Sequence, residues 1–153
     1  MEKTLVILKP CTVQRGLIGE VITRFEKKGL RLVGMKMTWL TEEILNVHYA
    51  HLKEKPFFQR IKDAMMICPV IVCCWEGVDA VHVVKTLTGS TNGRNAAPGT
   101  IRGDYSMSVQ ENIVHASDSI ETAETELNRF FTKEELFEYR QLQLPSLYAN
   151  DEY

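Results

Sequence analysis

The chain passes from a short apolar run into a helix within the stretch Asn112-Ile113-Val114-His115-Ala116-Ser117-Asp118-Ser119. Apolar residues then recur at close to the 3.6-residue spacing of an amphipathic helix, at Ile120, Ala123, Leu127 and Phe130. Asp118 or Ser119 is placed to cap that helix. His115 therefore lies between a strand and a helix N-terminus, where free N–H groups favour anions. This position makes it a candidate phosphate-handling histidine; the alternative is a histidine buried in the core.

Outward from this junction, strand and helix patterns alternate along the chain. Besides the histidine strand, strands are predicted at residues 4–8, 30–39 and 69–75, and helices at 16–28, 41–52, 57–65 and 80–87. The order is βαββαβ with an inserted helical pair. It predicts an α+β, ferredoxin-like fold with a four-stranded antiparallel sheet and a C-terminal extension. The length suits one domain over residues 1–153.

Composition excludes several broad classes of function. Lys plus Arg number 18 against 20 for Asp plus Glu, a net charge of −2, so strong nucleic-acid binding is not expected. No apolar run is long enough to cross a membrane, and no secretory signal pattern opens the chain. The four cysteines fit neither a disulfide framework nor a metal-binding spacing. We therefore expect a cytoplasmic protein.

Phosphate chemistry would have to proceed without a glycine-rich phosphate loop, because no Walker pattern is present. Residues 90–108 form a long segment without periodicity, and such segments in compact domains are often functional. Scattered donors would neutralise charge on transferring phosphoryl oxygens. The candidates are Lys9, Lys85, Thr91, Arg94, Arg102 and Asn112. For Lys9, the alternative is an ordinary solvated lysine after a buried strand.

His115 has the chemistry of a nucleophile, because a mostly neutral imidazole at pH 7 leaves one ring nitrogen free. Glu126 on the following helix is the expected orienting partner, with Ser117 a second hydrogen-bonding neighbour. Asn112 lies three residues before His115, so a shared site requires a bulge between them. A zinc site at His48 and His51 is the weaker alternative, since no third ligand has suitable spacing.

The stretch around His115 resembles the N-x-x-H-G-S-D-S signature of nucleoside diphosphate kinases. The resemblance extends over essentially the whole chain, through Thr4-Leu-Val-Ile-Leu-Lys9-Pro10, Val13-Gln-Arg-Gly-Leu17, Gly19-Glu20, Arg24-Phe-Glu26, Lys55-Pro-Phe-Phe58, Trp75-Glu-Gly77 and Ala97-Pro-Gly-Thr-Ile-Arg102-Gly-Asp104. These motifs stand in the order typical of the family.

The resemblance implies ping-pong transfer of the terminal phosphate of a nucleoside triphosphate, mainly ATP, to nucleoside diphosphates, and so a role in maintaining NTP and dNTP pools. It makes His115 the phosphorylated nucleophile, supported by Tyr49 and Glu126. Mg2+ would arrive on the nucleotide phosphates rather than on a direct protein site. Expected nucleotide contacts are Lys9, Phe57, Ile61, Lys85, Thr91, Arg102, Val109 and Asn112. The family also implies a homo-oligomer, a tetramer or a hexamer.

Five positions depart from the family pattern. Cys11-Thr12 follow Lys9-Pro10 where an aspartate and a small residue are usual, and Ala116 replaces a glycine. Gly93 stands where proline is common and is expected to loosen its loop. Lys85 stands where an arginine normally contacts the phosphates, and lysine lacks the planar, two-pronged donor.

Two other classes of function compete with the kinase. A regulatory ferredoxin-like module would keep the cleft without turnover, but the intact set of Lys9, Arg102, Asn112 and His115 argues against it. A nucleic-acid binder would need an aromatic-rich strand and a basic surface, which the chain lacks.

We expect Arg94 to compensate partly for the weaker phosphate contact of Lys85. If so, Arg94→Ala and Lys85→Ala each raise the KM for nucleotide in steady-state assays. An unchanged KM in Arg94→Ala would contradict this compensation.

Overall fold

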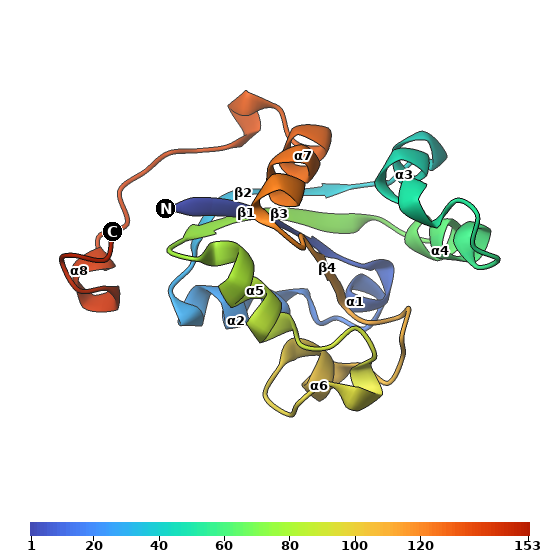
Figure 1. The fold of residues 1–153 in the computed structure, drawn as a ribbon, viewed down its shortest axis with the longest axis horizontal. Helices are drawn as coiled ribbons and strands as arrows, with labels where there is room; N and C mark the ends of the chain where they lie inside the picture. The colour runs from blue at the N-terminus through green and yellow to red at the C-terminus, as the bar shows by residue number, and fades with distance from the viewer.

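The computed structural model describes residues 1–153 and contains one four-stranded antiparallel sheet (Figure 1). The strands lie in the order β2-β3-β1-β4. They are β1 (Glu2–Leu8), β2 (Arg31–Thr38), β3 (Val70–Gly77) and β4 (Val114–Ala116). The predicted α+β, ferredoxin-like architecture is confirmed.

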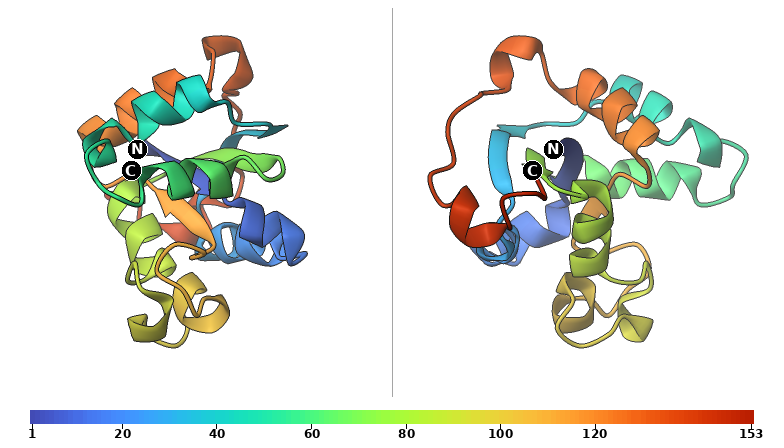
Figure 2. Two further views of the ribbon diagram at one scale, coloured as in Figure 1. Left: turned by 90° about the vertical axis from the view of Figure 1, so that its right-hand side faces the viewer. Right: turned by 60° about the vertical axis from the view of Figure 1, so that its left-hand side comes forward.

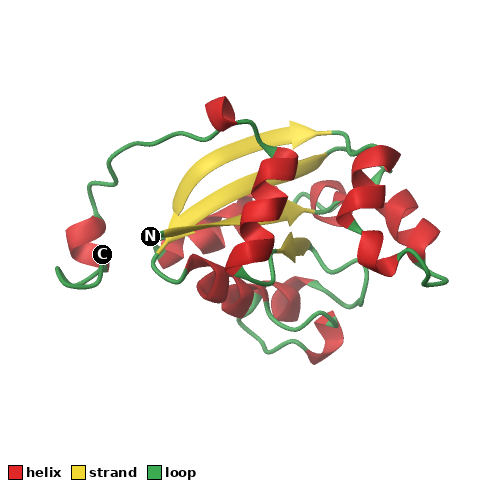
Figure 3. Cartoon of the chain, turned by 45° about the horizontal axis from the view of Figure 1, so that its top comes forward, coloured by secondary structure: helices red, strands yellow, loops and turns green.

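Helices cover both faces of this sheet, as Figure 3 shows for α7 on one of them. The α-helices are α1 (Pro10–Gln14), α2 (Ile18–Lys28), α3 (Glu42–His48), α4 (Phe58–Met65), α5 (Ala80–Thr88), α6 (Ile101–Tyr105), α7 (Ile120–Phe130) and α8 (Leu144–Leu147). Short 3₁₀ turns lie at Ala50–Leu52, Gly93–Asn95 and Lys133–Glu135.

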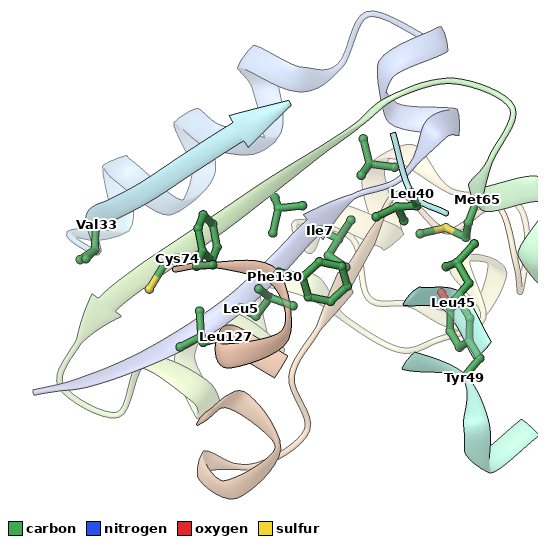
Figure 4. Packing of buried hydrophobic residues seen from close by; sticks show 13 residues of the cluster. Leu5, Ile7, Val33, Leu40, Leu45, Tyr49, Met65, Cys74, Leu127 and Phe130 are labelled. Carbon is green, nitrogen blue, oxygen red and sulfur yellow. The ribbon is translucent and has the colours of Figure 1, made fainter. Parts of the chain in front are cut away.

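Side chains alternate between the two faces of the sheet along each strand, and a hydrophobic core forms on each face. Leu5 and Ile7 of β1 point to a cluster that α7 closes with Leu127 and Phe130 (Figure 4). Val6 and Leu8 point to the opposite cluster, which α2 and α5 cover. β3 is buried along its whole length, as its unbroken apolar run predicts.

Local signals explain several helix boundaries. The hydroxyl of Ser119 accepts the N–H of Thr122 at 3.1 Å, so Ser119 rather than Asp118 caps α7. Thr41 caps α3 in the same way. Gly29 ends α2 in the left-handed region, with φ of 106°.

The segment 90–108 is ordered around short helices rather than being a structureless loop. It holds a 3₁₀ turn at Gly93–Asn95 and then α6, which the hydroxyl of Thr100 caps. Gly93 is buried and donates its N–H to Ser108 O at 3.0 Å. A Cβ on Gly93 would lie 2.3 Å from the carbonyl oxygen of Ser106. The expectation that Gly93 loosens this loop is therefore wrong, because the glycine permits the close packing.

The C-terminal tail returns to the end of the sheet where β1 begins. Phe137 N–H donates to Val33 O at 2.8 Å, and Tyr148 Oη accepts from Val78 N–H at 3.3 Å. The two chain ends consequently lie close together in all views (Figures 1 and 2). No helix has both the length and the apolar character needed to span a membrane.

Replacing Gly93 by alanine tests this close packing. We expect Gly93→Ala to lose about 1–3 kcal/mol of unfolding free energy in urea, because the methyl group meets backbone. The matched control is Gly19→Ala in α2, where an added Cβ meets nothing within 4 Å. The control should be neutral or gain up to about 1 kcal/mol. Equal effects of the two substitutions would contradict the packing argument.

Candidate active site

The sequence-predicted residues meet in one cleft of about 980 Å³. It lies at the end of the sheet where β1 ends and β4 begins, between α4 and the 90–112 segment. Ten of the twelve predicted site residues line it: Lys9, Tyr49, Phe57, Ile61, Lys85, Thr91, Arg102, Val109, Asn112 and His115. The other two, Ser117 and Glu126, lie behind this lining.

His115 stands on β4, opposite Ile7 of β1. Its Nε2 is hydrogen-bonded to Oε2 of Glu126, a carboxylate that is only 3% exposed. Glu126 thus makes the contact with His115 that the predicted orienting role requires. With Nε2 engaged, Nδ1 is the ring nitrogen that remains free for chemistry. Ser117 is fully buried and its hydroxyl has no hydrogen-bond partner, so it makes no bond to His115.

The predicted bulge between Asn112 and His115 is present as a tight turn at Ile113. Ile113 has φ of 76°, and Val114 N–H donates back to Asn112 O at 2.9 Å. The carbonyl oxygen of Ile113 accepts hydrogen bonds from Lys9 N–H at 2.9 Å and from Thr12 Oγ1 at 2.5 Å. The turn brings the side chains of Asn112 and His115 to the same cleft.

Lys9, at the end of β1, is held inside the cleft rather than solvated. Its Nζ donates to Asn112 Oδ1 at 2.6 Å and to Gln110 O at 3.1 Å. Burial, with the nearby Arg102 charge, lowers the pKa of Lys9 to about 8. An anionic ligand would favour the charged form and oppose that shift. Asn112 also donates to Thr91 O and Val109 O at 2.9 Å each, so it fastens the loop.

Arg102 of α6 is tied to three carbonyl oxygens. It donates to Asn112 O at 3.0 Å, Gly89 O at 3.0 Å and Val114 O at 2.7 Å. Burial lowers the pKa of Arg102 to about 10. The guanidinium therefore fixes the walls of the cleft and presents its charge from a set orientation.

Lys85 and Arg94 both line the cleft, but they are held differently. Lys85 Nζ forms an ion pair with Asp118 Oδ1 at 2.6 Å, and this bond lowers the pKa of Asp118. Arg94 is exposed and donates to Met107 O at 2.8 Å. Arg94 therefore has a cleft-facing position from which it can supplement Lys85.

Three apolar side chains form part of the cleft lining. Phe57 and Ile61 come from the start of α4, and Val109, 46% exposed, comes from the opposing loop. Lys62, a buried residue of α4, donates to Glu42 and Asn46 of α3 at 2.8 Å each and so joins the two helices. An apolar lining that includes an aromatic ring suits a planar ring system.

The other residues that depart from the family pattern, Cys11, Thr12 and Ala116, fit their local surroundings. Cys11 is a half-buried free thiol in α1, and burial raises its pKa. Thr12 is buried and supports the turn at Ile113. The methyl group of Ala116 packs against the core on the α5 face.

The sequence-based prediction missed Arg129 and considered His48 only as a possible metal ligand, not as a neighbour of His115. The ring of His48 stands edge-on to that of His115, with 4.6 Å between centroids, and Arg129 Nη1 lies 2.9 Å from His48 Nδ1. Glu126 and Arg129 are three apart on α7, a spacing that places both on one face. That spacing could have indicated from the sequence that Arg129 lies near the site.

His48 and His51, the weaker alternative for a metal site, do not come together. His51 is exposed, whereas His48, His115 and Glu126 have potential ligand atoms within 4.8 Å of one another. The guanidinium of Arg129 already lies against this cluster, and its fixed positive charge opposes a second cation there.

Comparisons with known proteins agree on one family. A family model described as nucleoside diphosphate kinase matches residues 2–136. A nucleoside diphosphate kinase of Parabacteroides distasonis is 82% identical over 153 residues, 100% of both chains. One of Rhodopirellula baltica is 47% identical over 152 residues, 99% of this chain and 100% of the relative. The structure of a halophilic nucleoside diphosphate kinase from Halobacterium salinarum in complex with CDP has a TM-score of 0.94 and 42% identity, covering 96% of this chain and 98% of that one. The matched residues include every side chain that lines the cleft.

Burial of His48 predicts a pH dependence of stability. Burial, together with the charges of His115, Arg129, His51 and Lys9, lowers its pKa from 6.5 to about 2. Between these values the unfolded chain binds a proton that the folded chain does not, so stability is lost as pH falls below about 6.5. This group contributes up to about 1.4 kcal/mol per pH unit.

We expect His48→Gln to reduce the loss of unfolding free energy between about pH 6.5 and 5, measured by urea denaturation at each pH. The control His82→Gln, at an exposed position on α5, should keep the wild-type slope. A wild-type slope in His48→Gln would show that His48 carries no such penalty.

Proposed function

The chain belongs to the nucleoside diphosphate kinase family, and on that premise we propose that it transfers the terminal phosphate of a nucleoside triphosphate, mainly ATP, to nucleoside diphosphates through a phosphohistidine on His115. Members of this family are phosphotransferases that bind nucleotides. One observation carries the residue assignment. His115 faces the cleft with Nε2 bonded to the buried Glu126, which leaves Nδ1 as the nucleophile.

In the first half-reaction, the lone pair of Nδ1 attacks the terminal phosphorus while the bond to the leaving diphosphate oxygen breaks. The ring keeps its proton on Nε2 and donates it in a hydrogen bond to the Glu126 carboxylate, whose negative charge stabilises the positive charge that develops on the ring. A nucleoside diphosphate then takes the phosphoryl group by the reverse steps. Repeated with different acceptors, this ping-pong exchange would maintain NTP and dNTP pools.

Lys9, Arg102, Thr91 and Asn112 would stabilise the negative charge on the transferring phosphoryl group. Lys85 and Arg94 would contribute from the edge of the cleft. Support for these roles comes from their common location in the cleft and from the hydrogen bonds that orient Lys9 and Arg102. Donors fixed before the reaction need little reorganisation during it. We assign Tyr49, a buried residue that lines the cleft, to support of His115.

The base would stack on Phe57 between Ile61 and Val109. Every base presents a π-face, so stacking explains tolerance of all bases. The Halobacterium salinarum relative was solved in complex with CDP, and we extend nucleotide binding of that kind to this cleft.

The family requires a divalent cation, and we propose Mg2+ carried on the nucleotide phosphates. The cleft lining supports this, because its only carboxylates are Glu111 and Asp118, and Lys85 already neutralises Asp118. Bound in this way, Mg2+ would screen phosphate charge. Chelation by EDTA should accordingly stop turnover.

We also propose that residues 1–153 form one domain that assembles as a homo-oligomer, a tetramer or a hexamer, in the cytoplasm. The hydrogen bonds of the tail to Val33 and Val78 support a single domain. Exposed apolar side chains on and just after the edge strand β2, Met35, Met37 and Trp39, support a subunit contact. Four free cysteines suit a reducing compartment.

Incubation with γ-labelled ATP and Mg2+ should yield an acid-labile, alkali-stable phosphoprotein, and His115→Ala should abolish the label. Glu126→Gln should lower the rate of labelling by about 10²-fold, because Nε2 loses its charged acceptor.

A coupled assay for GTP formation from GDP and ATP checks turnover in the same preparations. Substitution of the exposed His82 by alanine is the control and should change neither readout. Wild-type protein that binds ATP but forms neither the label nor GTP would identify a binding module instead of a kinase.

A further inference from the structure

Glu126 has a second histidine beside it. Its Oε2, which bonds to Nε2 of His115, lies 3.4 Å from Nδ1 of His48. His48 is only 6% exposed and stands directly behind His115. Two histidine nitrogens therefore face one carboxylate oxygen, and each would bond to it if it carried a proton.

The contact between Arg129 and His48 decides which of the two histidines donates a hydrogen bond to the Glu126 carboxylate. A guanidinium has only donors, so the 2.9 Å contact from Arg129 Nη1 requires a lone pair on Nδ1 of His48. The single proton of the neutral ring must then be on Nε2. That nitrogen is buried and has no hydrogen-bond partner, so nothing at Nε2 favours this tautomer.

From this geometry we infer that Arg129 is a positioning residue, which holds His48 as the Nε2–H tautomer and thereby reserves the Glu126 carboxylate for His115. Without Arg129, His48 gains by moving its proton to Nδ1 and donating it to Oε2 of Glu126. That bond competes with the one from His115 and weakens the hold on the nucleophile. The inference rests on the proposed role of His115.

Two further observations agree with this role. Burial, with the neighbouring basic groups His115, Arg129, His51 and Lys9, keeps the pKa of His48 far below neutrality, so a neutral ring with one proton is the state to consider. Arg129 and His48 are absent from the cleft lining, so neither is available to bind nucleotide. Their influence must pass through Glu126 and the ring of His115.

The tautomer of His48 can be read directly by NMR in protein labelled with [15N]histidine, because the chain contains only four histidines. Wild-type protein should show Nε2–H at His48, and Arg129→Met should shift it toward Nδ1–H. Arg129→Lys, which keeps a charged donor, should restore the wild-type tautomer. A wild-type His48 with its proton on Nδ1 overturns the inference without any variant.

Kinetics supply the second readout. Arg129→Met should lower the single-turnover rate of His115 phosphorylation by about 10-fold, as loss of an outer-shell partner does, with the KM for nucleotide unchanged. Lys133→Met, which removes an exposed positive charge just beyond α7, is the matched control and should leave tautomer and rate at wild-type values.

An unchanged tautomer and rate in Arg129→Met would overturn the inference. So would a loss of rate accompanied by a lower melting temperature but no tautomer change, because that pattern marks a purely structural arginine. Failure of the proposed function appears differently: wild-type His115 would not become labelled, whatever the tautomer of His48.

Discussion

Reversal of the backbone at Ile113 is the constraint on which the cleft depends. A β-branched residue with φ of 76° costs about 1–3 kcal/mol, and hydrogen bonds around it offset that cost. The carbonyl of Ile113 accepts from the Lys9 amide and from Thr12, and that of Asn112 accepts from Arg102. These bonds tie the end of β1, helix α1 and helix α6 to one turn. His115, Lys9 and Arg102 are therefore fixed relative to one another without a ligand.

The positively charged side chains of Lys9 and Arg102 also hold the cleft together through hydrogen bonds. Lys9 bonds to Asn112 and Gln110, and Arg102 bonds to three carbonyl oxygens. Their pKa values are lowered because partial burial deprives these cations of water without supplying a full negative charge. In the proposed function, a nucleotide phosphate would supply that charge. Binding and positioning would then use the same groups, without a glycine-rich phosphate loop.

Much of this arrangement is predictable from sequence, for physical reasons that differ between residues. Strand alternation and helix spacing predicted the sheet, and the three-residue spacing from Asn112 to His115 predicted the bulge. The two helical pieces between residues 93 and 105 escaped prediction because tertiary bonds, rather than periodicity, specify them. The effect of Gly93 was mispredicted because the partner that demands it, Ser106, is brought near only by the fold. The contact between His48 and Arg129 joins residues 81 apart, and no local pattern reports it.

Both chain ends lie at the end of the sheet that is remote from the cleft. β1 begins at Glu2, paired with Gly77, and reaches the cleft only at Lys9, roughly 20 Å further along the strand. The tail returns to the same remote end through Gly29 and Val78. A short linker between the termini would therefore close the chain without crossing the entrance of the cleft. The fold is in this respect suited to circular permutation, and fusion partners at either end would leave the entrance open.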